Sequence, residues 1–439
     1  MSDKCDKRAS RPSRRAVLQA TGGAVATAAL AGCSAVDGAV LGDSEMPSDA
    51  IQAGLLTFTE GAGAVLGIQS QRGAEQAVQR INNQGGIAGR RRVELEVRDE
   101  STEAVETYQS FIDDGFDVTF GPVSSGTHQS IAPMIEENGV INVGTDGGVT
   151  TLYEQTVPNP TYSFRAQNAD VMEVVTCARE AIRRVGADNI DTIGGINPNY
   201  AFGRGEWELF RNTMRSLTDV EVTTVEFPEL TQSDMSAEVN RLVSDPPDVT
   251  FGSLWGGDVI TFLEAAQGTG FFTNTTLVGG IMYSAADAMT QELLSGVDAI
   301  FASRNYYWDY PTIERWPPGE QLYTFARQQE GIGVPTAHYM SGYGAVTAWA
   351  TAVEKAVDLL GEYPSQQQIS RMMEGHGFFT PAGYHMISED HEARSTTFIG
   401  DLEWNDDRGA PILTNVSEYA PKTTSPPPSV SATDWIEGW

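Results

Sequence analysis

A serine- and threonine-rich turn, residues 124–127, has the composition of an anion-binding site. It reads Ser-Ser-Gly-Thr and follows a short apolar stretch, residues 118–120, that predicts a buried strand. A helix is predicted to begin at Thr127, and the free backbone N–H groups and the dipole at a helix start favour a negative charge. The hydroxyls of Ser124, Ser125 and Thr127 add hydrogen-bond donors, so the turn predicts a site for a carboxylate. The same residue types also cap helices without binding any ligand.

A histidine next to this turn, His128, raises the alternative of a hydrolase. A serine nucleophile on an α/β scaffold generally stands in a Gly-x-Ser-x-Gly elbow, and its histidine is oriented by an acidic residue. The sequence contains no such elbow, and no acidic residue is evidently placed to orient His128. We therefore interpret His128 as a surface residue of the helix and predict that the chain is not an enzyme.

Two further patterns match cofactor or metal sites only in part. Gly61, Gly63 and Gly67 follow the first predicted strand, but a dinucleotide-binding turn would need its last glycine at Leu66. Three histidines of the C-terminal part lack the spacing that places metal ligands on one helix face, and we expect them in solvent. They are His376, His385 and His391. The sequence therefore predicts neither a nucleotide cofactor nor a metal ion.

The first 33 residues carry three features of an export signal in the expected order. Arg14 and Arg15 stand in a basic lead, a run of small and apolar residues covers 16–30, and Leu-Ala-Gly-Cys ends at Cys33. The apolar run is shorter than the roughly 20 residues that a membrane-spanning helix needs, and its flanks are those of a signal peptide. We predict that residues 1–32 are removed and that a lipid on Cys33 anchors the chain to the outer face of the cell membrane.

Acidic residues outnumber basic ones strongly. The chain has 59 Asp and Glu against 28 Lys and Arg, a net charge of −31, and Lys355 and Lys422 are the only lysines after the signal. Such a domain repels itself in dilute buffer, whereas molar salt shortens the Debye length to about 3 Å and screens the repulsion. The composition predicts an extracytoplasmic protein of a salt-loving organism, an archaeon, and argues against nucleic acid as a partner.

Cysteine usage indicates that the exported chain is stabilised without an internal disulfide. Cys5 leaves with the signal and Cys33 is predicted to carry the lipid, so Cys177 remains alone. Stability must therefore come from a hydrophobic core, and about 400 residues with 40% hydrophobic content are enough for two domains.

Strands and helices alternate in two runs, one from residue 51 and one from residue 171. The first run has predicted strands at 51–56, 92–98, 118–120 and 140–143, separated by helices at 69–82, 104–113 and 127–138. The second has predicted helices at 171–185, 205–217, 236–243 and 259–267, and strands at 191–196, 220–225, 249–254 and 277–280. Alternation of this kind predicts parallel sheets with right-handed crossovers. The fold class is therefore α/β, with two doubly wound parallel-sheet lobes.

Four motifs follow one another in a characteristic order between about residues 51 and 401. They are Arg-Gly-Ala-Glu-Gln-Ala-Val at 72–78 with a glycine turn at 85–87, Gly-Pro-Val-Ser-Ser-Gly-Thr at 121–127, Asn-Tyr-Ala-Phe-Gly-Arg-Gly at 199–205, and Phe-Thr-Pro-Ala-Gly at 379–383 with Asp-His at 390–391. Together they resemble the type I periplasmic binding proteins, in particular the solute-binding proteins of branched-chain amino acid ABC transporters.

This resemblance implies two lobes joined by crossover strands, with a ligand held between them. It implies a small solute, an amino acid in the first place, and the permease of an ABC importer as partners, and we expect a monomer. The predicted segments are a signal peptide at 1–32, a tether at 33–50, a first lobe at 51–163 and 284–375, a second lobe at 164–283 and 376–420, and an irregular tail at 421–439.

The resemblance also implies ligand contacts in the first lobe. The turn with Ser124, Ser125 and Thr127 matches the first ligand loop of the family. Thr145 and Asp146 follow the next strand, where the family makes backbone and hydroxyl contacts to the ligand. Asp146 is an unusual neighbour for a carboxylate, so binding of a ligand ammonium and capping of a turn both stay open.

Ligand contacts in the second lobe are implied in the same way. The family's usual tyrosine falls on Phe202, and Tyr200 is a candidate to replace its hydroxyl. Asp258 matches the acidic residue that holds the ammonium of amino acid ligands, although it also suits the cap of the following helix. Trp255 and Tyr283 are candidate walls of the pocket.

One departure from the family concerns the loop at residues 60–67, where an aromatic residue is usual. The loop is aliphatic here, with Ala-Val-Leu-Gly at 64–67, so leucine-like solutes, other amino acids, amides and small carboxylates all stay open. A sensory receptor of the same fold and a secreted amidase are the alternatives from other functional classes.

Overall fold

The computed structural model describes residues 46–310 and 316–439, and Pro47–Trp439 forms one compact unit. The predicted signal peptide and the lipid site at Cys33 lie outside the described residues. Within the described part, no helix combines the length and the apolar composition needed to cross a membrane.

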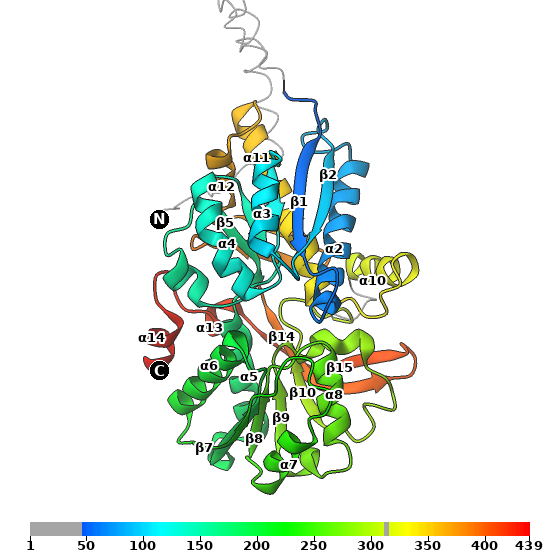
Figure 1. The fold of residues 1–439 in the computed structure, drawn as a ribbon, viewed down its shortest axis with the longest axis vertical. Coiled ribbons are helices and arrows are strands. Elements are labelled where there is room, and N and C mark those ends of the chain that lie inside the picture. Colours follow the sequence, from blue (N-terminus) through cyan, green and yellow to red (C-terminus); the bar gives the residue numbers. More distant parts are fainter. Residues whose placement is uncertain (1–45, 311–315) are drawn as a thin grey trace, which may run out of the picture. The chain divides into compact units, whose positions relative to one another are not determined.

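The unit Pro47–Trp439 contains two sheets, each with helices on both faces (Figure 1). In the first sheet, the strands that are parallel to one another form its larger part, and an antiparallel hairpin extends it at one edge. The strand order is β11 (Gly377–Thr380), β12 (Gly383–Ile387), β13 (Glu392–Arg394), β5 (Ser163–Asn168), β4 (Asn142–Gly144), β3 (Val118–Phe120), β1 (Ile51–Thr57) and β2 (Val93–Asp99). We call this sheet and its helices the first lobe.

The second sheet has a parallel part and one antiparallel hairpin at its other end. Its strand order is β15 (Ala410–Tyr419), β14 (Thr397–Asn405), β10 (Ala299–Ala302), β9 (Thr276–Gly279), β8 (Val249–Gly252), β6 (Thr192–Ile196) and β7 (Glu221–Glu226). We call this sheet and its helices the second lobe. Two mostly parallel sheets with interleaved helices confirm the predicted fold class.

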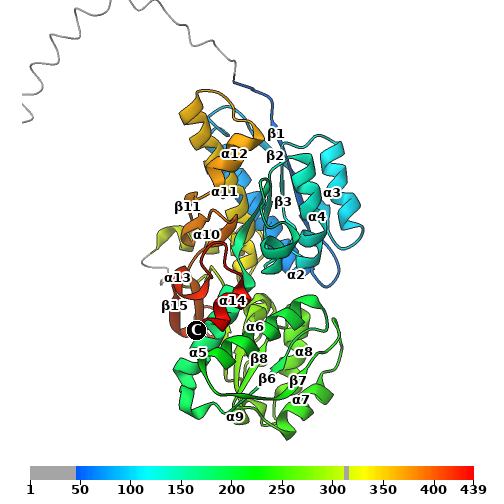
Figure 2. The same cartoon turned by 90° about the vertical axis from the view of Figure 1, so that its left-hand side faces the viewer.

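Helices of the first lobe cover both faces of its sheet. The helices are α2 (Ala64–Asn83), α3 (Ala104–Asp113), α4 (Ser125–Asn138), the π-helix η1 (Leu152–Thr156), α10 (Pro317–Gln329), α11 (Ala337–Leu360) and α12 (Gln366–Met373). Figure 2 shows α3 and α4 on one side of the strands and α11 with α12 on the other. Helices α2 and α11 approach closely, because a Cβ atom at Gly73 would stand 1.8 Å from the carbonyl oxygen of Tyr339.

Helices of the second lobe likewise enclose its strands. They are α5 (Asp170–Val185), the 3₁₀ turn η2 (Ala187–Asn189), α6 (Ala201–Leu217), α7 (Ser236–Ser244), α8 (Gly257–Ala266), α9 (Phe271–Asn274) and the 3₁₀ segment η3 (Ile281–Ala288). Phe210 of α6 stacks on Phe251 of β8 with the ring centroids 4.4 Å apart, and the lone Cys177 is buried in the same cluster.

The sheet assignment differs from the predicted lobe boundaries in three segments. Strand β5 lies almost wholly in the range predicted for the second lobe, yet it pairs with β4 of the first sheet. Strand β10 falls in the range predicted for the first lobe, yet it pairs with β9 and β14 of the second sheet. Strands β11, β12 and β13 fall in the range predicted for the second lobe, yet β13 pairs with β5 of the first sheet. The hydrophobic pattern of such short strands carries no information on their partners, which the hydrogen bonds between strands decide.

The C-terminal tail is helical in part, so the prediction of an irregular tail is wrong. It forms α13 (Pro421–Thr424) and α14 (Ala432–Glu437), and Ser431 caps α14 by accepting a hydrogen bond from the backbone N–H of Asp434. Ile436 is 1% exposed and packs with Val171 and Met172 of α5. Burial of this apolar side chain gives the tail a reason to order.

Candidate functional site

A cavity of about 350 Å³ opens where the carboxyl ends of the strands of both lobes meet. Its first-lobe residues follow β1, β2, β3 and β4, and its second-lobe residues follow β5 to β10. They are Phe58, Glu60, Gly61, Ala62, Gly63, Leu66, Ser101, Val123, Ser124, Ser125, Asp146 and Gly148 from the first lobe, and Asp170, Tyr200, Phe202, Leu230, Trp255, Ile281 and Arg304 from the second. Open parallel sheets bind ligands beyond these strand ends, so the cavity has the expected place for a site.

Aromatic side chains from both lobes form much of the wall. Tyr200 and Phe202 have their ring centroids 5.8 Å apart, and the indole N–H of Trp255 donates a hydrogen bond of 3.0 Å to the hydroxyl of Tyr200. Phe58 faces the cavity from the first lobe. A Cβ atom at Gly63 would stand 2.4 Å from the ring of Phe58, and one at Gly67 would stand 2.0 Å from its carbonyl oxygen. These two glycines therefore make room for Phe58, which explains a pattern that resembles a nucleotide-binding turn only in part.

A buried arginine, Arg304, organises the polar end of the cavity. Its Nη1 donates to Asp146 at 2.7 Å, its Nη2 donates to Asp170 at 3.1 Å, and its Nε donates to Glu173 at 2.8 Å. The second oxygen of Asp146 is 2.8 Å from Nε2 of His338, which lies on α11. The network therefore joins β4, β10, α5 and α11 of both lobes through one guanidinium group.

The carboxyl groups around Arg304 differ in pKa. Burial alone would raise the pKa of Asp146, but the charges of Arg304 and His338 and their hydrogen bonds lower it well below its usual range. Burial raises the pKa of Asp170 to about 6 and that of Glu173 to about 7, although Arg304 lowers both. Burial also raises the pKa of Glu206 far above its usual range, and its carboxylate oxygens have no hydrogen-bond partner among the described residues.

A second buried acid, Glu100, lies behind the serine-rich turn. Its carboxylate accepts hydrogen bonds from the backbone N–H groups of Val123 at 2.8 Å and Ser124 at 2.7 Å. Ser124 in turn caps α4, because its hydroxyl oxygen accepts a hydrogen bond of 3.3 Å from the N–H of Thr127. Burial raises the pKa of Glu100 to about 7, although these hydrogen bonds lower it. The backbone N–H of Ser124, which belongs to the turn predicted to bind an anion, thus already has a carboxylate of the protein as its partner.

Residues 50–409 match the model of a periplasmic binding protein family. The chain belongs to this family. A Leu/Ile/Val-binding protein of Rhizobium johnstonii is 28% identical over 236 residues, 52% of this chain and 61% of that protein. A leucine-specific-binding protein of Salmonella typhimurium is 24% identical over 230 residues, 52% of this chain and 60% of that protein. The chain thus matches about three fifths of the length of these two relatives.

Solved structures of solute-binding proteins share the fold. One is a protein of an ABC transporter from Rhodopseudomonas palustris in complex with 3,4-dihydroxybenzoic acid, with a TM-score of 0.72, 16% identity, and coverage of 85% of this chain and 98% of that one. Another is a leucine-binding protein from Thermotoga maritima, with a TM-score of 0.67, 18% identity, and coverage of 83% and 98%. At these identities the likeness concerns the fold alone.

Six residues that the sequence singled out line the cavity of this periplasmic binding protein. They are Ser124, Ser125, Asp146, Tyr200, Phe202 and Trp255. Their contact with a ligand stays a prediction. Both carboxylate oxygens of Asp146 already have partners within the protein, Arg304 and His338. These contacts bear on both alternatives predicted for Asp146, binding of a ligand ammonium and capping of a turn.

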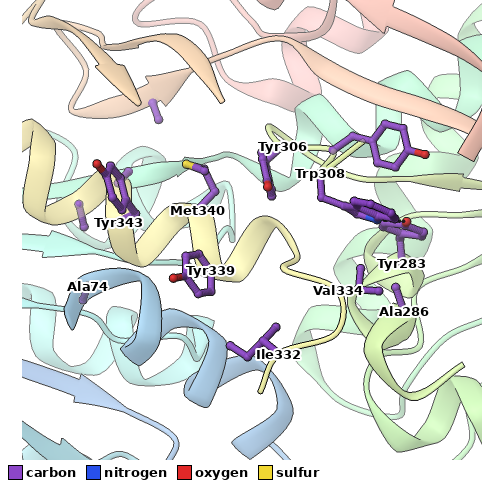
Figure 3. Packing of buried hydrophobic residues seen from close by; sticks show 14 of the residues in the cluster. Ala74, Tyr283, Ala286, Tyr306, Trp308, Ile332, Val334, Tyr339, Met340 and Tyr343 are labelled. Atoms are coloured by element: carbon purple, nitrogen blue, oxygen red, sulfur yellow. Dashed lines mark hydrogen bonds between the residues drawn. The ribbon is translucent and has the colours of Figure 1, made fainter. Parts of the chain in front are cut away.

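Four predicted site residues stand elsewhere. Thr127 lies one turn into α4, and the hydroxyl of Thr145 is buried and donates to the carbonyl oxygen of Pro122 at 3.3 Å. Tyr283 is buried in the core beside Trp308 (Figure 3), whose indole N–H donates to its hydroxyl at 2.9 Å. Asp258 lines a neighbouring cavity of about 340 Å³ that shares Trp255 with the first, and it accepts hydrogen bonds from the N–H of Thr231. Loop packing, which the sequence does not display, sets these positions.

The histidines expected at the surface are buried, so that interpretation is wrong. His128 is fully buried, with its Nε2 3.5 Å from the hydroxyl of Ser163. The other three are between 2% and 5% exposed, and each contacts a polar atom or a ring of the first lobe; they are His376, His385 and His391. Burial lowers the pKa of His128 to about 3, and that of His376 and His385 to about 4. A neutral ring packs in a core, and the sequence alone gives no sign of this.

The sequence analysis missed Phe58, Asp170 and Arg304, although a signal for them was present. Each directly follows a strand of the parallel part, namely β1, β5 and β10. The rule that ligands bind at the carboxyl ends of strands applies to all strands. The predicted ligand contacts follow β3, β4, β6, β8 and β9 only, and the segment that contains β10 was predicted in the first lobe.

Proposed function

We propose that the chain is the extracytoplasmic solute-binding component of an ABC importer. It captures a small organic solute, an amino acid as the first candidate, in the cavity between its two lobes and delivers it to a permease. Within this proposal, the N-terminal segment is an export signal, a lipid on Cys33 holds the protein at the outer face of the cell membrane, and the protein acts as a monomer.

The observation that carries this proposal is the composition of the cavity wall. Ten strand ends contribute to it, five from each sheet. A solute there contacts both lobes at once, so it binds more tightly when the lobes are closed and shifts an equilibrium between open and closed forms. Capture and release need no bond to be made or broken, which agrees with relatives that are named as binding proteins.

The strong negative charge fits an exposed position in concentrated salt. The chain carries a net charge of −31, and its self-repulsion is screened only at high ionic strength. We therefore propose molar KCl as the working condition for binding measurements.

Thermal unfolding of the full chain against a panel of amino acids, amides and carboxylic acids tests the proposal. A solute at 100 times its dissociation constant stabilises the fold by about 2.7 kcal/mol. For a unit of roughly 390 residues this raises Tm by about 3 °C, from an unfolding entropy of about 2.1 cal/mol/K per residue. Trp255→Ala should reduce the response, whereas Trp404→Ala, on β14 and outside the cavity, should keep it. A chain that responds to no solute of any class would contradict the proposal.

Delivery to a permease is tested separately. Cells without the protein should lose uptake of the solute that the panel identifies. Normal uptake together with a lost behavioural or transcriptional response would instead indicate a sensory receptor of the same fold.

A further inference from the structure

The fixed charges of the cavity are mainly negative. Its charged lining residues are three acids, Glu60, Asp146 and Asp170, and one base, Arg304. Two buried acids, Glu173 and Glu206, stand behind them, and a Cβ atom placed on Gly280 would be 3.6 Å from Glu173 and 3.7 Å from Glu206. Burial raises the pKa of both carboxyls, so they add little negative charge at neutral pH. His338 is the base on the other side, where it contacts Asp146.

Arg304 is poorly available to a ligand carboxylate. Each of its three nitrogens donates to a different carboxylate of the protein, and its side chain is only 4% exposed. An anion that approached Arg304 would meet the negative charge of Asp146 and Asp170 at the same place. Like charges that face each other in a poorly hydrated cavity repel more strongly than in water.

The protein itself already uses part of the start of α4. The backbone N–H groups of Val123 and Ser124 donate to the carboxylate of Glu100, and the hydroxyl oxygen of Ser124 accepts a hydrogen bond from the N–H of Thr127. An anion that used the remaining donors, the serine hydroxyls and the first N–H groups of α4, would stand beside the carboxylate of Glu100. An anion that took the donors of Glu100 would leave a buried carboxylate without hydrogen bonds, which is unfavourable.

Asp170 keeps one carboxylate oxygen free to accept a hydrogen bond from a solute in the cavity. Asp170 uses Oδ1 for Arg304, while its Oδ2 accepts no hydrogen bond from the described residues. Asp170 lines the cavity together with Tyr200, Phe202 and Trp255. Aromatic faces attract a cation within about 6 Å, most strongly where water is excluded. A carboxylate and several rings around one space are the elements of a site for an organic ammonium group.

We infer that the cavity binds its solute through a positively charged ammonium group next to Asp170 and the aromatic wall, and that it rejects solutes that carry only a negative charge. The inference rests on the proposed solute-binding function and narrows it to organic cations. It gives no role to a carboxylate of the solute, so an amine without one binds as well. It also separates this chain from the Rhodopseudomonas palustris protein that was solved in complex with 3,4-dihydroxybenzoic acid.

Pairs of probes that share a shape and differ in charge test the inference with the wild-type full chain. One pair is 3-methylbutylamine and 4-methylpentanoate, and the other is benzylamine and benzoate. Calorimetric titration in one KCl buffer should show that each amine binds at least about tenfold more tightly than its acid, since a charge-assisted hydrogen bond generally exceeds that factor. L-Leucine and L-phenylalanine serve as zwitterions of the same shapes.

Variants then locate the cation. Asp170→Asn should weaken amine binding by about tenfold, whereas Asp188→Asn, an exposed position of η2 outside the cavity, should leave it unchanged. The melting curve of each variant shows whether it is folded, and the wild-type pairs decide the question even if Asp170→Asn does not fold.

Each other outcome overturns the inference in a distinguishable way. Binding of amino acids without binding of amines would overturn the cation inference and leave the proposed function intact. Binding of the acids in preference to the amines would do the same and would indicate an anion receptor. A chain that binds none of the amines, acids or amino acids would contradict both the inference and the proposed function.

Discussion

Replacement of Arg304 by methionine tests whether one guanidinium group holds the polar end of the cavity together. The change removes three hydrogen bonds of 2.7, 2.8 and 3.1 Å and leaves Asp146, Asp170 and Glu173 buried without their cation. Removal of one partner from a buried ion pair costs about 3–5 kcal/mol. For a unit of roughly 390 residues, this lowers Tm by about 4–6 °C at neutral pH.

The loss should depend on pH in a defined direction. Burial raises the pKa of Asp170 to about 6 and of Glu173 to about 7, and Arg304 opposes both shifts. An acid whose pKa is higher in the folded chain stabilises the fold below its unfolded pKa, and this contribution is lost as pH rises through the folded pKa. The wild type should therefore lose stability between about pH 4 and 7 from these groups. Arg304→Met raises both pKa values further, so its cost should be larger at pH 8 than at pH 5, where protonated carboxyls need no cation.

Urea unfolding of both chains at pH 5 and pH 8 measures the two effects. Arg241→Met is the matched control, because Arg241 pairs with Glu226 and Glu238 but is 52% exposed. An exposed pair contributes at most about 1 kcal/mol. Equal losses for Arg304→Met and Arg241→Met, or a loss for Arg304→Met that is the same at both pH values, would refute the role assigned to Arg304.

Three other substitutions probe the fold. Glu206→Gln should stabilise the chain at pH 8 and change little at pH 5, measured by urea unfolding, because burial keeps the pKa of this carboxyl high; a loss at both pH values would show that the carboxyl is needed. Gly73→Ala should cost about 2 kcal/mol or more of stability, since its Cβ would stand 1.8 Å from the carbonyl oxygen of Tyr339. The control Gly205→Ala in α6 places a Cβ with nothing within 4 Å and should be neutral or stabilising by up to about 1 kcal/mol. Similar melting temperatures for the two variants would contradict the close contact of α2 and α11. Ile436→Ala should cost about 2–4 kcal/mol if the tail packs on α5 as described, and an unchanged melting temperature would show that it does not.

The sequence was sufficient for the fold class because its strands and helices are separated by clear hydrophobic periods. Strands such as Ile51–Thr57 and Val249–Gly252 are buried along almost their whole length and consist mainly of apolar and small residues, as is typical of parallel strands covered on both faces. The partners of the strands at the crossover between the two lobes could not be predicted in the same way. The segment Ala299–Ala302 has the same apolar character, and its place beside β9 depends on contacts between residues more than 20 positions apart.

A site residue could be predicted where it comes directly after a strand, because the end of the strand fixes its position. Ser124, Tyr200 and Trp255 come directly after strand ends, and all three line the cavity. Asp258 lies further along, in the first turn of α8, where the loop carries its side chain to the adjacent cavity and to the N–H of Thr231. Alignment with a family predicts the residue type at such a position. It does not predict on which side of Trp255, and therefore in which of the two cavities, the side chain lies.

The charge of the cavity is a property of residues brought together from distant segments. Asp146, Asp170, Glu173 and Arg304 come from three places in the chain that are up to 158 positions apart. Taken singly, each has an ordinary interpretation as a cap or a helix residue. Taken together, they show that the one cation facing the cavity within the described residues is already bound by carboxylates of the protein. Specificity is a difference between affinities, so the repulsion of anions by this arrangement selects a solute as effectively as a new attractive contact would.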